Sequence, residues 1–272
     1  MRSPFFLSAE SMSILKKTDY EKKSTRERYR IERSELYFKK SSGNTPYILF
    51  AFAIIVGIYA YFGGGPLHFV AALFFTGLGI WQFFYVKQAA VTPPEVDARM
   101  RWINDNLDLE TDALNTSDME YDAFMAAEKI SVYGYTALPV QEEKAILRAD
   151  SSDDVGRSSH MQFTCFILGE DRLEAYSTVR TMFGEEKKTP LKESTIMEWP
   201  YTQLREIGFE RLAADCAIEA GSEKTEIRKF PVISIRSTNK RENRTYAICE
   251  DCRGDAADLL ARVRQKIEQE KE

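Results

Sequence analysis

The chain has 272 residues, with 37 Lys and Arg against 42 Asp and Glu, and 44% of its residues are hydrophobic. This apolar content excludes a wholly disordered chain, and the length predicts one or two domains. The charge is unevenly distributed: residues 1–45 hold eleven Lys and Arg against six Asp and Glu, residues 46–86 hold none of these four, and residues 87–272 are acidic. The composition and charge of the whole chain are therefore averages over three regions that differ in their content of charged residues.

Residues 1–45 form a basic arm, in which we expect a helix over about 18–40, opened by a Thr-x-x-Glu capping box. Two interpretations of this helix stay open: contact with anionic lipid headgroups, or a solvated helix held by ion pairs between turns. Nucleic-acid binding is not expected, because the arm is mixed in charge and an apolar segment follows it. The candidate membrane-surface residues are Arg26, Arg28, Arg30, Arg33, Lys39, Lys40 and Lys87.

Residues 46–86 predict a transmembrane helical hairpin. Its two apolar runs, 46–62 and 67–86, contain 17 and 20 residues, close to the length that crosses a bilayer as a helix. The sequence GGGP at 63–66 separates them and breaks the helix. A continuous helix would be about 60 Å long, twice the thickness of the bilayer core. A hairpin buried in a soluble protein is the alternative, disfavoured because a soluble core would have to cover both helices on all sides.

Basic residues flank the hairpin on both sides and its turn has none, so the positive-inside rule places both termini in the cytoplasm. We therefore expect a two-span integral protein of a bacterial inner membrane or an equivalent organelle membrane, with the lipid bilayer as its first partner. Anchoring is the expected role, because the spans offer few polar groups for transport. Small residues at helical spacing predict helix packing, within the hairpin or in a homo-oligomer: Ala53, Gly57, Ala72 and Thr76.

Residues 87–160 are predicted to be an acidic helical linker. One helix is expected from about residue 95, after a Pro-Pro pair, and another over about 117–130, opened by a Ser-x-x-Glu capping box. The acidic run at 105–122 predicts a solvated or partner-facing surface rather than a metal site, because it lacks the spacing of a calcium loop. Residues 150–160 are rich in Ser and Asp and are expected to form a flexible boundary.

Residues 161–272 change to short runs typical of strands, followed by a helix. The predicted strands are 161–168, 172–183, 195–199, 201–209, 215–220, 227–236 and 244–250. The helix is opened by Asp255. Its apolar stripe consists of Ala256, Leu260, Val263 and Ile267.

This order of elements, with the segment WPYTQLREI at 199–207 as its middle strand, resembles the pleckstrin-homology-like (PH-like) fold, including its bacterial membrane-associated and GRAM-type members. The resemblance covers residues 161–272 and implies a bent sheet plugged at one open end by the C-terminal helix. The expected fold class is therefore a two-helix membrane hairpin joined to a cytosolic α+β domain, with another α+β topology as the alternative. Family members that bind phosphoinositides usually carry a basic cluster after the first strand, whereas residues 169–172 are mostly acidic.

The sequence makes no positive case for catalysis or for a cofactor. The chain has two histidines, which argues against a His-based triad, and no glycine-rich phosphate loop. Cys249 and Cys252 form a C-x-x-C motif, a weak candidate for half a zinc site or for a redox pair. Zinc binding needs two more ligands, which Cys165 and Cys216 supply only if the fold gathers them. An ordinary pair of thiols, at a strand end and in the turn before the last helix, is favoured over both.

The expected function is a non-enzymatic, membrane-anchored adaptor or assembly subunit of a membrane protein complex. Its PH-like domain would meet protein partners through a sheet edge or a groove. Two alternatives stay open. One is a lipid-responsive module that uses the basic arm and the sheet domain, and the other is a subunit of an oligomeric channel or transporter.

Overall fold

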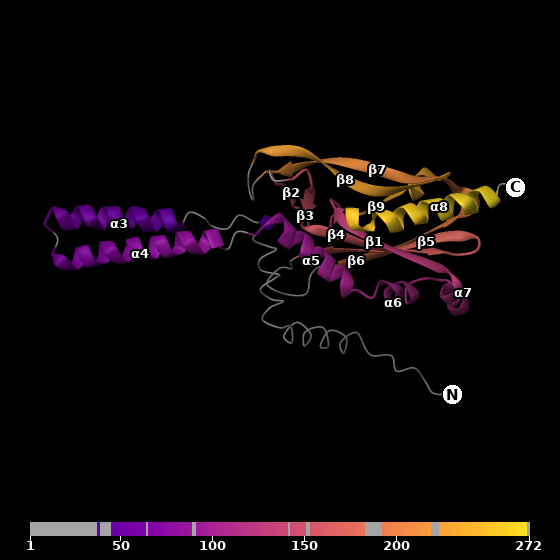
Figure 1. Cartoon of the computed structure of the whole chain (residues 1–272), viewed down its shortest axis with the longest axis horizontal. Coiled ribbons are helices and arrows are strands. Elements are labelled where there is room, and N and C mark those ends of the chain that lie inside the picture. The colour runs from indigo at the N-terminus through magenta and orange to yellow at the C-terminus, as the bar shows by residue number, and fades with distance from the viewer. Residues whose placement is uncertain are drawn as a thin grey trace, which may run out of the picture.

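The structure is a computed structural model, and it describes residues 37–38, 45–63, 65–88, 91–140, 142–150, 153–182, 192–218 and 223–270. Figure 1 shows two helices, α3 (Thr45–Tyr61) and α4 (Pro66–Gln88), which extend together away from a domain built around two β-sheets. The domain combines sheets with helices, so the α+β class is confirmed. The helix predicted over 18–40 lies outside the described residues, apart from Tyr37 and Phe38.

The helices α3 and α4 form a hairpin whose interface is built from small and aromatic residues. A Cβ atom added to Gly57 would lie 3.9 Å from the Cβ of Ala72, and the ring of Phe50 packs against Gly79. Gly63 makes the turn with a φ of 130°, which a residue with a Cβ rarely adopts. The predicted helix bounds and the glycine turn therefore agree with the structure.

Within the described part of the chain, one helix is long and apolar enough to cross a membrane by length and composition, over Pro66–Phe83 of α4. The apolar stretch Tyr47–Tyr61 of α3 is shorter. Most large side chains on both helices face outwards, and Phe62 is 82% exposed. A pair of helices with an apolar outer surface is thus established, and a double crossing of a membrane stays a prediction.

Three helices follow the hairpin: α5 (Pro93–Asp105), α6 (Leu109–Leu114) and α7 (Tyr121–Ala126). The helix expected near residue 95 is α5, which Thr92 and Glu95 open with a capping box and which buries Val96, Met100 and Ile103. The helix expected over 117–130 is wrong in length and start. Its presumed cap, Ser117, instead donates a 2.6 Å hydrogen bond to Glu174 in the neighbouring sheet.

The first sheet has the order β1-β4-β5-β6, and all its neighbours are antiparallel. Its strands are β1 (Glu128–Thr136), β4 (His160–Leu168), β5 (Arg172–Thr181) and β6 (Lys192–Pro200). The strand β1 pairs with β4 along its whole length, from Glu128 opposite Leu168 to Thr136 opposite His160. Residues 87–160 were predicted as a helical linker, but they supply a complete strand of this sheet because the ladder with β4 organises them.

The second sheet has the order β3-β2-β7-β8-β9. Its strands are β2 (Leu147–Ala149), β3 (Gly156–Ser158), β7 (Leu204–Ala217), β8 (Thr225–Ser237) and β9 (Arg244–Ala247). The runs predicted separately at 201–209 and 215–220 are mainly one long strand, β7, paired with β8 from Leu204 to Ala217. The boundary expected at 150–160 contains the buried strand β3.

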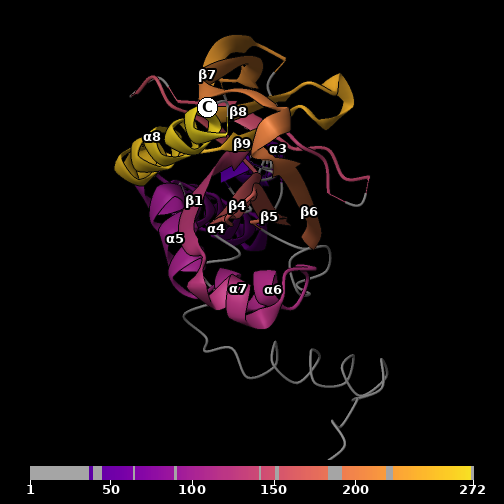
Figure 2. The same ribbon diagram turned by 90° about the vertical axis from the view of Figure 1, so that its right-hand side faces the viewer.

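The C-terminal helix α8 (Arg253–Gln269) packs against β1 of one sheet and β7 of the other. Figure 2 shows it lying along one side of the two sheets. The predicted stripe is confirmed, with Leu259 added to it. The buried residues are Ala256, Leu259, Leu260, Val263 and Ile267. Arg264 donates to the carbonyl of Ile207, and Lys266 donates to that of Gly169, so the helix also ties both sheets through hydrogen bonds.

The residues that precede the hairpin are anchored in the domain. Tyr37 and Phe38 are fully buried and belong to the same hydrophobic core as α5 and the sheets. The guanidinium of Arg148 on β2 lies 4.0 Å from the centre of the Tyr37 ring and donates to the Tyr37 carbonyl. The chain is therefore fixed to the domain both before α3 and after α4.

Candidate functional site

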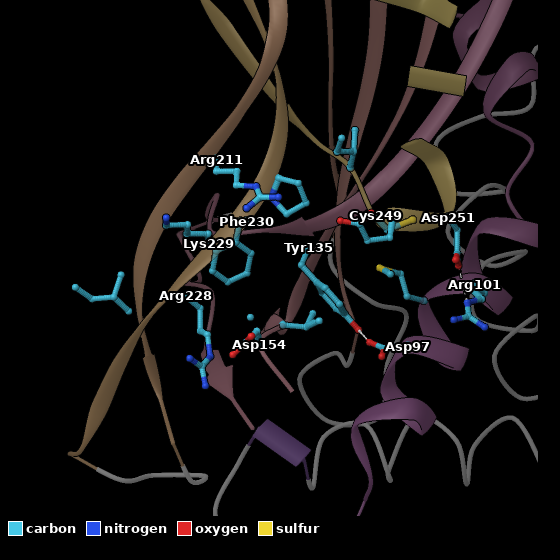
Figure 3. Close-up of a pocket in the computed structure, with 17 residues that line it drawn as sticks. Asp97, Arg101, Tyr135, Asp154, Arg211, Arg228, Lys229, Phe230, Cys249 and Asp251 are labelled. Atoms are coloured by element: carbon cyan, nitrogen blue, oxygen red, sulfur yellow. Dashed lines mark hydrogen bonds and ion pairs between the residues drawn. The ribbon is translucent and has the colours of Figure 1, made fainter. Parts of the chain in front are cut away.

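A pocket of about 550 Å³, called the β8 pocket here, opens between β8, α5 and the segment that follows β9 (Figure 3). Its apolar lining includes Phe230 and Pro231 of β8. Gly156 of β3 makes room for this wall, because a Cβ there would come within 2.7 Å of the Phe230 ring. The two sheets and α5 thus meet around one cavity, with a volume typical of small-molecule sites.

Positive side chains line the β8 pocket, and two of them are not neutralised. Arg101 pairs with Asp251 at 2.8 Å, and Arg228 pairs with Glu226 at 2.7 Å. By contrast, the side chains of Arg211 and Lys229 make neither an ion pair nor a hydrogen bond with any part of the chain that the structure describes. Asp154, which also lines the pocket, likewise makes no ion pair or hydrogen bond with the described part of the chain, so the uncompensated charges of the lining are two positive and one negative.

Asp97 and Tyr135 on the opposite wall belong to a buried ion network, whose centre is Arg157, only 2% exposed. Its guanidinium donates to both oxygens of Asp97, at 2.9 and 2.8 Å, and to both oxygens of Asp153, at 3.0 and 2.8 Å. The hydroxyl of Tyr135 donates to Asp97 at 2.7 Å. The hydrogen bonds from Arg157 hold the pKa of Asp153 below its ordinary range. These carboxylates are committed to structure, so they are poor candidates for acid–base catalysis.

Cys249 and Cys252 lie at the edge of this pocket, with their sulfur atoms 3.4 Å apart. Cys249 follows β9, and Cys252 ends the 3₁₀ turn η4 (Glu250–Cys252), from which α8 continues. Cys249 is half-buried and lines both the β8 pocket and an adjoining one of about 290 Å³. Cys252 is buried and lines neither. The strand β9 ends at Ala247, so Cys249 lies just beyond the strand rather than at its end, while Cys252 lies in the turn before α8 as expected, and the two thiols are in contact.

The position of Cys249 depends on a close approach of two backbones. A Cβ at Gly134 of β1 would lie 2.5 Å from the carbonyl carbon of Ile248, so only glycine lets β1 pass so near this segment. Tyr133, the preceding residue, lies close enough to Cys249 to lower the pKa of its thiol. An isolated glycine inside a strand signals such an approach.

The environment of the pair separates the acidities of the two thiols. The two sulfur atoms share a hydrogen bond, and the amide of Cys252 donates to the Cys249 carbonyl at 3.2 Å. The hydrogen bond with Cys252 is the largest influence that lowers the pKa of Cys249 to about 7, against the opposing effect of burial, and the neighbouring backbone amides and Tyr133 lower it further. The pKa of Cys252 is raised by its hydrogen bond to Cys249 and by burial. At neutral pH the pair therefore holds a substantial fraction of a thiolate, located on Cys249.

The other candidate residues fall in separate places. Cys165 lies on β4 and Cys216 on β7, both buried. Within the described residues, no three His, Cys, Asp or Glu side chains gather as metal ligands. Six of the seven membrane-surface candidates lie outside the described residues. Only the backbone of the seventh, Lys87, is described, near the end of α4.

The helix-packing candidates lie in or beside the hairpin interface. Ala53 is buried and Gly57 faces Ala72. Thr76 donates a 2.8 Å hydrogen bond to the carbonyl of Ala72 one turn earlier in α4, a contact within the same helix. Three of the four small residues therefore bring α3 and α4 together inside one chain.

Sequence reasoning missed the β8 pocket, because it is assembled from six separate elements: α5, β1, β3, β7, β8 and η4. The clearest overlooked signal was Gly134 between Tyr133 and Tyr135, inside a segment then assigned to the linker. Comparison with protein-family models, with curated proteins and with solved structures finds no match.

Proposed function

We propose that the chain is a two-span membrane protein whose PH-like domain serves as an adaptor or assembly subunit, with no reaction of its own assigned to this role. The observation that carries the proposal is the contrast in burial between the hairpin and the domain. Leu73 of α4 is 73% exposed, whereas Leu173 of β5 is fully buried. An apolar surface on all sides of two helices exceeds what soluble monomers leave uncovered, and a bilayer covers it.

The lengths of the helices support the double crossing. At 1.5 Å per residue, the 17 residues of α3 span about 25 Å and the 23 residues of α4 about 35 Å, around the 30 Å of a bilayer core. Local thinning of the bilayer or adjustment of the flanking residues accommodates the shorter helix.

The order of strands supports the PH-like assignment. A four-stranded antiparallel meander, β1-β4-β5-β6, is followed by a three-stranded one, β7-β8-β9, and then by the helix that packs across both. The hairpin β2-β3 is an insertion after β1. In this arrangement the first strand is β1, so the loop to examine for a phosphoinositide site is 137–159 and not 169–172. That loop has three Lys and Arg against five Asp and Glu, which still disfavours an anionic headgroup.

We place protein docking at the free edge of the first sheet. The strand β6 pairs with β5 on one side, and no other described strand pairs with it. Its first four residues, 192–195, are exposed. An extended peptide can add to such an edge through backbone hydrogen bonds.

The proposal is tested by purifying the full chain from the membranes of the producing cells in a mild detergent. We expect one or more partners, or further copies of the chain, in stoichiometric amounts. A monodisperse monomer without a partner would overturn the adaptor role.

The edge itself is tested with Ser194→Pro and Thr195→Pro. Adjacent backbone amides point to opposite sides of a strand, so one variant loses a hydrogen bond to β5 and the other loses only an outward donor. Thermal unfolding identifies the second variant by its unchanged midpoint, and we expect it to lose the partner. Ser194→Ala controls for the side chain. Retention of the partner by the stable proline variant would exclude this edge.

A lipid-responsive role is the second candidate, favoured by the outer part of the β7–β8 hairpin. This part lies at the end of the domain from which α3 and α4 extend (Figure 1), and it carries Ile227, 68% exposed, beside Arg228 and Lys229. A polarity-sensitive dye on Ile227→Cys, in full-length protein with Ser at 249 and 252, reports contact with nanodiscs. Thr202→Cys is the matched control. A blue shift only at 227, only with anionic lipid, supports this role, and equal signals at both sites exclude it.

A further inference from the structure

We propose that Cys249 and Cys252 form a thiol–disulfide exchange site that reacts with small, negatively charged disulfides entering the β8 pocket. This activity is separate from membrane anchoring and from partner docking. It rests on three observations: the contact between the two sulfur atoms, the unequal exposure of the two cysteines, and the uncompensated charges of the pocket.

The first observation is the distance between the sulfur atoms. They lie 3.4 Å apart across a 3₁₀ turn, and a disulfide bond is about 2.05 Å long. Closing the bond therefore requires a movement of about 1.4 Å, which side-chain rotation within the turn can supply. Neither Cys165 nor Cys216 is a sulfur partner for this pair, since they lie on β4 and β7.

The second observation is that the two cysteines differ in access and in charge. Cys249 lines two adjoining pockets, while Cys252 is 4% exposed behind it. The donors around Cys249 favour its thiolate, and the same negative charge keeps Cys252 protonated. An accessible thiolate backed by a buried thiol is the arrangement of an attacking and a resolving cysteine.

The third observation concerns the substrate. Figure 3 shows Arg211 and Lys229 on the β8 side of the pocket, across from Cys249, whose sulfur lies towards Asp251. Asp251 is paired with Arg101, and Glu250 with Arg253. Asp154 on the opposite side also has no ion pair, so the unpaired charges of the lining are two positive and one negative. The positive ones predominate on the side of β7 and β8, so a disulfide that carries carboxylates is favoured there over a neutral one.

The exchange has two steps. The Cys249 thiolate attacks one sulfur of R–S–S–R′, forms a mixed disulfide and releases R′–S⁻, which takes up a proton. Cys249 then carries no charge, so its contribution to the raised pKa of Cys252 is removed and only the effect of burial and of nearby carboxylates such as Asp255 remains. Cys252 gives its proton to water and attacks the Cys249 sulfur, which forms the internal disulfide and releases R–S⁻. The two protein thiols are oxidised, and one external disulfide is reduced to two thiols.

The test uses the full chain in detergent, reduced and then freed of reductant, with oxidised glutathione as the probe. We expect a loss of two hydrogens by mass spectrometry, mapped to a peptide that joins residues 249 and 252. Cys252→Ser is expected to stop at a stable glutathione adduct on Cys249, and Cys249→Ser to give neither product. Cys216→Ser is the matched control and is expected to behave as the unsubstituted chain.

Two results would overturn the proposal. One is a chain that stays fully reduced in excess oxidised glutathione while Cys252→Ser forms no adduct. The other is a disulfide or adduct that maps mainly to Cys165 or Cys216. Because no partner or membrane is needed for this reaction, either result leaves the adaptor role untouched.

The role of Arg211 and Lys229 in selecting the substrate is tested by comparing two disulfides. We expect Arg211→Ala with Lys229→Ala to slow the reaction with oxidised glutathione about fivefold, and to leave the reaction with neutral hydroxyethyl disulfide unchanged. Lys240→Ala, an exposed substitution on another loop, is the control. An equal effect on both disulfides, or on neither, overturns the assignment of a negatively charged substrate.

Tyr133 is inferred to be a positioning residue, and a pH profile tests it. The titratable groups around the pair are Tyr133 on β1, Asp251 in the turn and Asp255 on α8. Alkylation of Cys249 by iodoacetamide is expected to rise with pH around a midpoint near 7. Tyr133→Phe removes a hydroxyl that lowers the pKa of the Cys249 thiol, so the midpoint is expected to move to higher pH. An unchanged midpoint in a folded variant would show that Tyr133 has no such role.

Discussion

The hairpin and the sheet domain place their apolar side chains on opposite sides of the backbone. On α3 and α4 the large apolar residues face outwards, and small residues such as Gly57 and Ala72 meet inside. In the domain the strands β4 and β5 are almost wholly buried, and ionic groups close the gaps between elements. A leucine therefore has a different environment in each part, exposed on the outer surface of the hairpin and enclosed in the core of the domain.

The largest expected effect comes from replacing leucine by arginine in two separate variants, one in the domain and one in the hairpin. Leu173→Arg buries an unpaired charge in the core, and we expect it to destabilise the domain by more than about 4 kcal/mol. Leu73→Arg should leave the thermal unfolding of the domain unchanged and make membrane insertion less favourable by about 3 kcal/mol. Circular dichroism and carbonate extraction measure the two quantities. If carbonate extracts Leu73→Arg from membranes no more readily than the original chain, the proposed difference between the hairpin and the domain is contradicted.

The buried ion network around Arg157 allows a second comparison, between buried and exposed charged groups within the domain. Arg157→Ala leaves Asp97 and Asp153 without their partner, and we expect a loss of about 3 kcal/mol in the free energy of unfolding. Arg262→Ala breaks an exposed pair with Glu128 and should change stability far less. Urea titration of the full chain in detergent compares them. Similar losses for both would mean that burial does not govern this network.

The approach of β1 to the segment before Cys249 gives a smaller effect. Gly134→Ala places a Cβ 2.5 Å from the Ile248 backbone, and we expect a cost of about 2 kcal/mol with faster alkylation of Cys252 as the turn is displaced. Gly208→Ala on β7 is the matched control, because its added Cβ meets no atom within 4 Å. Thermal midpoints and thiol mapping are the measurements. Equal midpoints for the two variants would contradict the described close approach.

The smallest effect is a pH dependence. The folded-state pKa of Asp153 is lowered by Arg157, so this carboxylate contributes stability above its unfolded pKa, near 3.8. That contribution is lost as the pH falls through the lower folded-state value. Asp153→Asn is therefore expected to be less stable than the original chain at pH 6, with the difference shrinking towards pH 3. A difference that grows on acidification would reverse the assigned sign.

The sequence predicted those elements whose pattern is local. The hairpin follows from 41 uncharged residues, and α8 follows from its stripe at helical spacing. The strand β1 was missed because it follows an acidic helical run and is organised by its ladder with β4. The strand β3 was missed because three buried residues among serines and aspartates carry no periodic signal.

The site was predicted only in part. The C-x-x-C motif fixed the spacing of the cysteines, but not the contact of their sulfur atoms or the pocket beside them. Those depend on Gly134 and Phe230, which are distant from the motif in sequence. The acidic appearance of residues 87–160 also concealed that Asp97 and Asp153 share one buried arginine.

Because Tyr37 and Phe38 are buried in the domain, the hairpin is attached to the domain at both of its ends. Seven peptide units separate Phe38 from Thr45, and five separate Gln88 from Pro93. The two connecting segments therefore span at most about 25 and 18 Å. A domain joined to the hairpin by two short segments cannot move or rotate relative to the hairpin as freely as a domain joined by a single linker. Any ligand of the β8 pocket would therefore bind within a restricted range of distances from the hairpin.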